Sequence, residues 1–323
     1  MQLFVIGGSG YIGSVVCERL LADGHILRGL ARSEIAAAQL SKDGVEPVRG
    51  GLGDADILRK ECAQADGVVQ IATGGFLIQA LESVSEAEAT TDVVLDALSG
   101  TGKPYIYTGG TGAWLDTGLA VPERVVTEAD PMTPPYFYVH LGKILRKILT
   151  SEDVRTIVLA PGQLYGRNGG YIGPIARLFN GVRAHGAVYA VNSDNAFTYV
   201  HVDDLADLYA IVLQRPLLRG LYLAATDTVS TLRVARAVSG AAGLGGELEM
   251  VDYLTMRALN GRANEVDFFA NCRASSVKAC DELGWRPHRP GVLDELAALP
   301  KPLDLQSVYP EPKRRLAASR VSS

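Results

Sequence analysis

The sequence predicts an α/β protein: a Rossmann-type, doubly wound parallel sheet followed by a smaller, mostly helical C-terminal lobe. Short apolar runs of β type alternate with helical segments over the first 165 of its 323 residues, which is typical of a parallel sheet with helices on both faces. A glycine-rich turn joins the first run to the first helical segment. Beyond residue 166 the alternation gives way to glycine- and asparagine-rich sequence and then to helical segments.

The expected strands are short runs of mostly apolar residues. They cover residues 3–6, 26–31, 67–72, 105–108 and 155–160. Right-handed crossovers place the C-terminal ends of such strands along one edge of the sheet, where ligands bind. Residues that directly follow a strand are therefore the first candidates for a binding site.

Changes of pattern along the chain predict three parts. Residues 1–165 are expected to form a nucleotide-binding domain, and residues 196–227, with two strands and a helix, to return to it. Residues 166–195 and 228–300 are expected to form a substrate-binding lobe. Residues 301–323 are rich in proline and then basic, which is typical of a solvated tail.

Composition and charge exclude several classes of protein. A net charge of -5 at pH 7 gives no reason to expect nucleic acid or an anionic membrane surface as a partner. The chain enters its first strand without a signal peptide, and no run of about 18 apolar residues could span a bilayer, so a cytoplasmic protein is expected. Cys17, Cys62, Cys272 and Cys280 lack CxxC spacing. They are expected to be reduced thiols, and no metal site is predicted.

The glycine turn comes directly after the first expected strand. Gly7, Gly10 and Gly13 allow the chain to reverse tightly, a pyrophosphate to approach the backbone, and helix and strand to pack closely. The anion then lies at a helix N-terminus, where free N–H groups and the helix dipole favour negative charge. The residues predicted to bind a dinucleotide here are Gly7, Gly10, Tyr11, Ile12 and Gly13.

The residues after the second strand bear on which dinucleotide is bound. An acidic residue there would accept hydrogen bonds from the adenosine ribose hydroxyls. Arg32 and Ser33 stand there instead, and a guanidinium with an adjacent hydroxyl can bind a 2′-phosphate. NADP(H) is therefore favoured over NAD(H) as the cofactor. The alternative is that Arg32 is a surface cation that opens the next helix.

Further motifs are spread along the chain besides the glycine turn. They are Gly50-Gly51-Leu52, Ile71-Ala72-Thr73, Pro161-Gly162-Gln163-Leu164-Tyr165-Gly166, residues 197–206 and Leu283-Gly284-Trp285-Arg286-Pro287. Together these motifs, over about residues 3–290, resemble those of the extended or atypical short-chain dehydrogenases/reductases, the group that includes the NAD-dependent epimerase/dehydratase family.

The resemblance implies further contacts with the cofactor. It implies that Leu52 packs over adenine and that Ala72 and Thr73 pass close to the cofactor. The other implied contacts lie at or after the ends of the expected strands at 105–108 and 155–160: Thr108, Gly109, Pro161, Gly162 and Leu164. The chain departs from the pattern at Gly51, where many members carry an aspartate that binds the adenine amino group. In the same group, His201-Val202-Asp203-Asp204 marks a structural strand-to-helix turn, and we favour that interpretation over a metal site.

The usual catalytic residues of this group are displaced or missing. Its members carry a tyrosine four residues before a lysine on one helix, assisted by a serine or threonine after the fifth strand. That spacing places both side chains on one helix face, so that the ammonium lowers the pKa of the phenol that transfers the proton. Here Lys143 is present, but Val139 occupies the tyrosine position. Gly110 occupies the serine position, and Thr111 lies one residue beyond it.

Other side chains are candidates for the proton donor. Tyr136, His140 and Lys143 fall at i, i+4 and i+7, on one stripe of a helix. Tyr138 points elsewhere unless the helix begins irregularly, and Tyr165 follows the expected strand at 155–160 at the same sheet edge. The alternative is that this aromatic stripe is core or pocket wall. The candidate catalytic residues are Lys143, Thr111, Tyr136, Tyr138, His140 and Tyr165, and Lys143 is also a predicted cofactor contact.

Three functions are consistent with these residues. The favoured one is an NADP(H)-dependent oxidoreductase acting on a carbonyl or alcohol of a small metabolite. The second is non-redox chemistry, such as isomerisation, epimerisation, dehydration or cyclisation, with the cofactor bound, and the third is an NADP-sensing protein without turnover. The resemblance also allows a homodimer.

The side chains expected near the site bear on the substrate. Aromatic residues, including Trp114 and Tyr171, favour an aromatic or apolar metabolite. A nucleotide sugar would need cations for its diphosphate, and Arg167, Arg177 and Arg183 either serve that purpose or lie on the surface.

Overall fold

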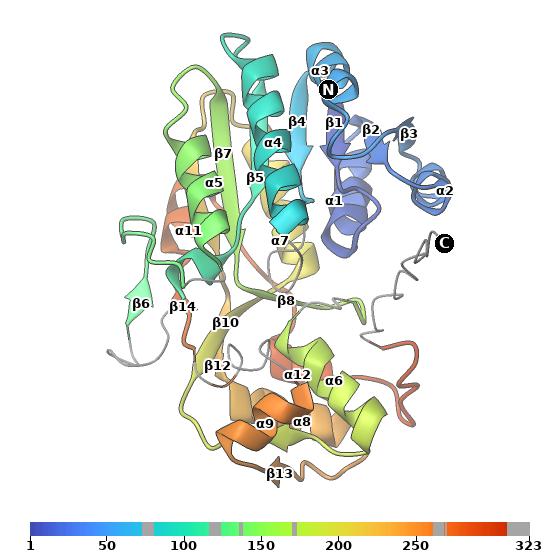
Figure 1. Ribbon diagram of the computed structural model, residues 1–323, viewed down its shortest axis with the longest axis vertical. Helices are drawn as coiled ribbons and strands as arrows, with labels where there is room; N and C mark the ends of the chain where they lie inside the picture. The colour runs from blue at the N-terminus through green and yellow to red at the C-terminus, as the bar shows by residue number, and fades with distance from the viewer. Residues whose placement is uncertain are drawn as a thin grey trace, which may run out of the picture.

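The computed structural model describes residues 1–72, 81–115, 124–135, 138–169, 173–260, 268 and 270–308, with residues 81–85 and 260 placed by their backbone alone. Within these ranges the centre of the molecule is a sheet in the order β11-β7-β5-β4-β1-β2-β3, and every neighbouring pair is parallel (Figure 1). Its strands are β1 (Gln2–Ile6), β2 (Ile26–Ala31), β3 (Glu46–Arg49), β4 (Gly67–Gln70), β5 (Pro104–Thr108), β7 (Arg155–Pro161) and β11 (Gly220–Ala224). The predicted Rossmann-type sheet is confirmed.

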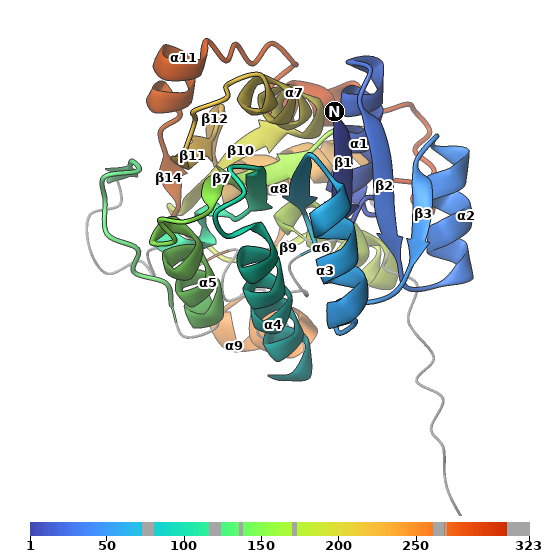
Figure 2. The ribbon, with the colours of Figure 1, turned by 90° about the horizontal axis from the view of Figure 1, so that it is seen from above.

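Helices cover both faces of this sheet (Figure 2). One face packs on α3 (Ala55–Gln64), α4 (Leu81–Leu98) and α5 (Val139–Leu149), through a core that includes Leu58, Val94 and Leu145. The other face packs on a second core, which includes Leu20, Leu40 and Leu208. The helices on that side are α1 (Tyr11–Ala22), α2 (Glu34–Lys42), α7 (Val202–Leu213) and α11 (Val277–Leu283). Burial on both faces explains why the central strands are nearly continuous apolar runs.

A separate three-stranded sheet links the main sheet to the C-terminal lobe. It consists of β8 (Gln163–Tyr165), β10 (Ala196–His201) and β12 (Asp227–Ser230). The structure differs here from the expected return of residues 196–227 to the main domain, because α7 and β11 join it but β10 does not. The chain leaves the main sheet at Gly162, where a Cβ atom would lie 2.3 Å from the Thr198 carbonyl oxygen. This close approach of β10 pairs it with β8 instead.

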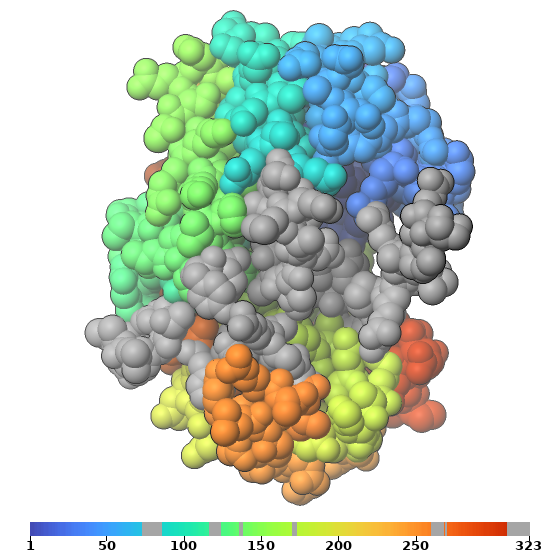
Figure 3. All heavy atoms as spheres, in the orientation of Figure 1, coloured from blue at the N-terminus to red at the C-terminus, as the bar shows by residue number. Residues whose placement is uncertain are grey.

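The lobe lies below the main sheet in Figure 1, and Figure 3 shows α6 and α9 at that end of the molecule. Its helices are α6 (Pro174–His185), α8 (Thr231–Ala241), α9 (Tyr253–Asn260) and α12 (Val292–Ala297). Short two-stranded pairs complete the described structure: β9 (Tyr189–Ala190) with β13 (Glu249–Met250), and β6 (Val125–Val126) with β14 (Arg273–Ala274). A short 3-10 helix, η1 (Thr111–Trp114), follows β5.

The packed chain continues beyond the expected start of the tail at residue 301. Val308 is 1% exposed. The Arg183 guanidinium of α6 donates hydrogen bonds to the carbonyl oxygens of Leu305 (2.6 Å) and Val308 (3.1 Å). Residues 301–308 are therefore part of the lobe, and residues 309–323 lie outside the described residues.

All four cysteines are free, as expected. Cys17 lies in α1 and Cys62 in α3, and burial raises the pKa of each thiol to about 12. Both are therefore protonated and unreactive near neutral pH. No helix in the described ranges has the length and apolar character needed to cross a membrane.

Candidate active site

The glycine turn between β1 and α1 is shaped by backbone contacts. Gly7 has φ of +100°, and a Cβ atom on it would lie 2.6 Å from the Ala72 nitrogen. A Cβ atom on Gly13 would lie 2.0 Å from the Gly7 carbonyl oxygen. Both positions therefore exclude any side chain, because β1, α1 and the end of β4 approach too closely.

Gly10 differs from Gly7 and Gly13 because the protein leaves room for a Cβ atom at this position. The nearest atom to a Cβ there would be the Gly7 oxygen, at 3.4 Å. Gly10 is the N-cap of α1, and no side chain caps the helix. The N-terminus of α1 therefore has no side-chain cap, and a helix N-terminus of this kind fits the pyrophosphate of a dinucleotide.

The residues predicted to bind the adenosine half of the cofactor follow β2 and β3. The Ser33 hydroxyl caps α2 by accepting the Ala36 N–H at 3.2 Å, which leaves its own proton free to donate. Arg32 is exposed, and no hydrogen bond or ion pair joins it to another described residue. Leu52 is half-buried after β3, and its carbonyl oxygen accepts a hydrogen bond from the Thr90 hydroxyl of α4 at 2.9 Å.

Gly51, which stands where the resembling group often has aspartate, is braced by another carboxylate. Its N–H donates to Oδ2 of Asp54 at 2.6 Å. Ala72 lies beside Gly7, and its N–H donates to the Ile6 carbonyl oxygen at 3.0 Å. Thr73 lies outside the described residues.

Two charged residues at this edge were not singled out from the sequence. Arg49 ends β3, and Nη2 of its side chain lies 2.7 Å from Oε1 of Glu34, the first residue of α2. The signal was present in the sequence, because a basic residue at the end of a strand lies at the ligand-binding edge.

The residues predicted to border the nicotinamide lie at and after the ends of β5 and β7. Thr108 is buried, and its hydroxyl donates to the Gln70 carbonyl oxygen at 3.1 Å and also hydrogen-bonds with the Tyr209 hydroxyl. That side chain therefore faces the core, and any cofactor contact of Thr108 must come from its backbone. Pro161 ends β7, and Leu164 pairs with Val200 of β10.

Tyr138 is the aromatic candidate that the described structure brings to the end of β5. It is the N-cap residue of α5, so it lies before the regular helix, and Val139 is the first helical residue. Its buried ring packs on η1, where a Cβ atom on Gly112 would lie 3.0 Å from Cζ of Tyr138. Because Tyr138 precedes the regular helix, its ring packs against Gly112, the residue that follows Thr111. Tyr136 lies outside the described residues.

The other candidates near α5 have different surroundings. Nδ1 of His140 lies 3.1 Å from Oε1 of Glu88, so the imidazole is engaged by α4. Lys143 is exposed on α5, and no ion pair joins it to another described residue. Thr111 is 4% exposed, and its carbonyl oxygen accepts a hydrogen bond from the Cys272 thiol at 3.3 Å.

Tyr165 is held in the core. Its hydroxyl donates to the Pro290 carbonyl oxygen at 2.8 Å, and its ring meets His201 edge-on with centroids 5.1 Å apart. Burial raises its pKa well above the usual range. These contacts favour a packing role for this tyrosine. Trp114 is also buried, and its indole N–H donates to the Asp130 carbonyl oxygen at 3.0 Å.

The segment His201–Asp204 makes structural contacts. Nδ1 of His201, the N-cap of α7, accepts the Asp203 N–H at 3.1 Å, and burial lowers the histidine pKa. The Asp204 carboxylate accepts the N–H groups of His288 (3.0 Å) and Arg289 (3.2 Å). It therefore ties the C-terminal segment to α7.

Tyr11 connects the glycine turn to the loop that enters the lobe. Its hydroxyl donates to the Gly166 carbonyl oxygen at 2.8 Å. In the same loop Arg167 binds Glu18 of α1 and Asp203 of α7, each at 2.5 Å. The cofactor-binding turn and the entrance to the lobe are thus held together by direct bonds.

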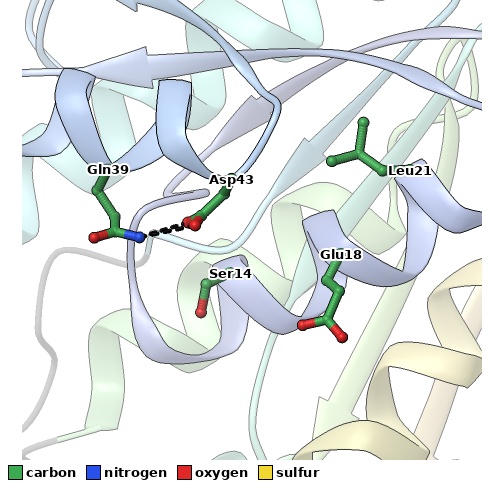
Figure 4. Close-up of a pocket in the computed structure, with 5 residues that line it drawn as sticks. All are labelled: Ser14, Glu18, Leu21, Gln39 and Asp43. Atoms are coloured by element: carbon green, nitrogen blue, oxygen red, sulfur yellow. Dashed lines mark hydrogen bonds between the residues drawn. The ribbon is translucent and has the colours of Figure 1, made fainter.

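A shallow hollow between α1 and α2 lies outside this constellation (Figure 4). Ser14, Glu18 and Leu21 of α1 line it together with Gln39 and Asp43 of α2. The Gln39 amide donates to the Asp43 carboxylate at 2.9 Å. With two carboxylates in its wall, the hollow is unsuited to a phosphate group.

Comparison with known proteins agrees with this geometry. The model of the "NAD dependent epimerase/dehydratase family" matches residues 3–220. The Saccharomyces cerevisiae "Uncharacterized protein YLL056C" is 29% identical over 322 residues, which cover 92% of this chain and 98% of the yeast protein. UDP-glucose 4-epimerase of Mycolicibacterium smegmatis is 27% identical over 311 residues, which cover 89% of this chain and 94% of that enzyme.

A solved structure shares the fold. UDP-glucose 4-epimerase of Thermus thermophilus, determined in complex with NAD, superposes with a TM-score of 0.68 at 21% identity, over 92% of this chain and 99% of that one. The family model covers most of the chain and includes the glycine turn that fits a pyrophosphate. The chain therefore belongs to the NAD-dependent epimerase/dehydratase family of extended short-chain dehydrogenases/reductases, enzymes that use a nicotinamide dinucleotide.

Proposed function

We propose that the protein is an NADP(H)-dependent oxidoreductase that interconverts a carbonyl and an alcohol on a small aromatic or apolar metabolite. The observation that carries this proposal is the position of Tyr138. Val139 occupies the position of the family's tyrosine. Tyr138, one residue earlier in the chain, places its phenol next to η1 and would take the role of that tyrosine. Lys143 keeps the lysine position of the family.

The residues that would hold the cofactor form a continuous path along the carboxyl edge. The N–H groups of Tyr11, Ile12 and Gly13 receive the pyrophosphate, Leu52 lies on the adenine side, and Arg32 with Ser33 receives the 2′-phosphate. Pro161, Gly162 and Leu164 border the nicotinamide. When bound, the nicotinamide supplies or accepts the hydride.

The proton is the part of the chemistry that this chain supplies. In reduction, the Tyr138 hydroxyl donates a proton to the carbonyl oxygen as that oxygen becomes an alcohol. The exposed Lys143 ammonium holds the nicotinamide ribose and favours the phenolate that remains. The Thr111 hydroxyl is the second donor at this place, one residue from Gly112.

The surroundings of two of the three candidate arginines, Arg167 and Arg183, support an apolar or aromatic substrate over a nucleotide sugar. Arg167 is bound to Glu18 and Asp203, and Arg183 to Leu305, Val308 and Asn180. A substrate diphosphate would have to displace these partners before either guanidinium could bind it. An uncharged metabolite needs no such exchange.

Non-redox chemistry with a bound cofactor is the second candidate, and Val139 favours it. A valine where the family carries its proton donor leaves the cofactor site intact but weakens the case for hydride transfer. In that case Tyr138 would act as an acid or base on the substrate without net consumption of NADPH.

The test is Tyr138→Phe, followed by the decrease in NADPH absorbance with a panel of aromatic and aliphatic ketones. We expect kcat to fall by about 100-fold or more, in the range found for loss of a general acid, while the Kd of NADP+ stays within about twofold because the phenol is not needed for cofactor binding.

The matched control is Tyr222→Phe. It removes a hydroxyl that is bonded to Glu282 at 2.9 Å, on β11 and away from η1, and should leave kcat unchanged. A Tyr138→Phe enzyme with kcat within threefold of the wild type would exclude Tyr138 as the donor. Conversion of substrate without any loss of NADPH would favour the non-redox alternative.

A further inference from the structure

Two arginines and one glutamate lie at or just after the ends of β2 and β3. Arg49 is the last residue of β3, and its partner in the parallel register is Ala31, the last residue of β2. Arg32 follows Ala31 directly, so both arginines lie at the carboxyl ends of neighbouring strands. Glu34 opens α2, and its Oε1 lies 2.7 Å from Nη2 of Arg49.

The ion pair between Arg49 and Glu34 is open to solvent. The exposed fraction is 50% for the Arg49 side chain and 88% for that of Glu34. A pair of this kind is screened by water and salt and contributes little to stability. Arg49 can therefore exchange its carboxylate partner for a ligand without exposing a buried charge.

The two signs of charge at this corner favour different cofactors. An acid near the end of the second strand accepts hydrogen bonds from the ribose hydroxyls of NAD, whereas an arginine there accommodates the 2′-phosphate of NADP. Glu34 is the first acid in the chain after the end of β2, and its carboxylate is paired with Arg49. A phosphate competes well for Arg49, because its oxygens accept paired N–H bonds from two guanidinium groups at once.

We propose that Arg49 is a specificity-determining residue for the 2′-phosphate of NADP(H) and that Glu34 is its internal competitor. A bound 2′-phosphate takes Arg49 from Glu34 and is held between Arg49, Arg32 and the Ser33 hydroxyl. Without that phosphate, Glu34 keeps Arg49. This assignment rests on the proposed preference for NADP(H). It adds that Arg49 strengthens the binding of the 2′-phosphate and that Glu34 weakens it.

The test compares Arg49→Gln and Glu34→Gln by titration calorimetry of the full chain with NADP+, NAD+, adenosine 2′,5′-bisphosphate and 5′-AMP. The last two probes differ only in the 2′-phosphate. The matched control is Arg59→Gln, because Arg59 of α3 is 51% exposed and lies 3.5 Å from Asp56 in a similar surface pair.

We expect Arg49→Gln to weaken the binding of NADP+ and of the bisphosphate by about tenfold, as expected for one charge-assisted contact to phosphate. The affinity for 5′-AMP should stay within about twofold of the wild type. It should also strengthen NAD+ because Glu34 is released. Glu34→Gln should strengthen NADP+ by about threefold, since the competing carboxylate is gone. Arg59→Gln should change none of these affinities.

Two results would overturn the assignment. The first leaves the proposed NADP(H) preference in place, and the second overturns that preference as well. If the wild type prefers the bisphosphate but Arg49→Gln leaves the ratio of bisphosphate to 5′-AMP affinity unchanged, Arg49 has no such role and the NADP(H) preference stands. If the wild type binds both probes equally, the NADP(H) preference fails and the role of Arg49 with it. Turnover of ketones with NADH then tests the oxidoreductase activity separately.

Discussion

Around β1, α1 and β4 the carboxyl edge is shaped by backbone contacts, whereas around β5 and α5 it is shaped by side chains. Gly7 and Gly13 cannot carry a Cβ atom because carbonyl and amide atoms of their neighbours lie in the way. At the other end, the family's tyrosine is absent from α5, and the neighbouring Tyr138 packs on η1 instead. A backbone cradle therefore tolerates no substitution, whereas a proton donor can shift by one residue if its hydroxyl reaches the same place.

The largest effect is expected from Gly13→Ala, which disrupts the backbone contacts of the glycine turn between β1 and α1. A Cβ atom 2.0 Å from the Gly7 oxygen forces β1 and α1 apart. We expect a loss of more than about 3 kcal/mol in the free energy of unfolding and no measurable NADP+ binding. Urea unfolding and calorimetric titration measure the two quantities.

The control for this change is Gly240→Ala in α8. A Cβ atom there meets nothing within 4 Å, so the gain in helix propensity should leave stability equal or raised by up to about 1 kcal/mol. Equal stabilities of the Gly13→Ala and Gly240→Ala variants would show that the turn is not sterically fixed.

Around β5 and α5, the proton-donating tyrosine should still function when it is moved by one residue. In the double variant Tyr138→Phe with Val139→Tyr, the phenol returns to the position four residues before Lys143. We expect kcat to recover by about tenfold or more over Tyr138→Phe alone, because one well-placed general acid contributes at least that much. Steady-state rates with the same ketone for both variants decide this, and no recovery would mean that the pocket is built around the Tyr138 site only.

The smallest effect is a dependence of stability on pH that arises at His201, beside Tyr165. Burial lowers the pKa of this histidine from its ordinary value of 6.5, and its Nδ1 accepts the Asp203 N–H. The unfolded chain therefore takes up a proton more readily, so the free energy of unfolding is highest above pH 6.5 and falls as the pH drops below it. We expect this histidine to account for a loss of up to about 1 kcal/mol between pH 7 and pH 5.5.

His201→Asn keeps a side-chain acceptor at the N-cap and removes the titrating group. Its stability should therefore fall less than that of the wild type between the same two pH values, as measured by urea unfolding. His185→Asn, which removes an exposed histidine of α6, should retain the wild-type dependence. If His201→Asn retains it too, the histidine is not the source.

The sequence allowed a prediction of the sheet but not of every strand's place in it. The runs at 26–31 and 155–160 match β2 and β7 closely, because burial on both faces leaves a continuous apolar pattern. Residues 196–201 have the same pattern, yet β10 pairs with β8 and β12. Strand pairing depends on close approaches such as that of Gly162 to Thr198, and a local pattern does not contain them.

The candidate site was predictable in the same unequal way. In the sequence Tyr136, Tyr138, His140 and Tyr165 were all candidates for the proton donor, and Tyr138 was expected to point elsewhere unless the helix began irregularly. Their partners then separate three of them: Gly112 for Tyr138, Glu88 for His140 and Pro290 for Tyr165. Each of these partners lies more than 25 residues away in the chain, so no spacing within the α5 segment could reveal it.

The sequence by itself predicted the Rossmann-type fold and the glycine turn, because apolar runs and glycine spacing are local patterns, and its motifs resembled those of the family. Only the tertiary structure decided which aromatic side chain meets η1 and that Arg49 pairs with Glu34. Those contacts join segments that are distant in the chain, and they arise only when the sheet brings its strand ends to one edge.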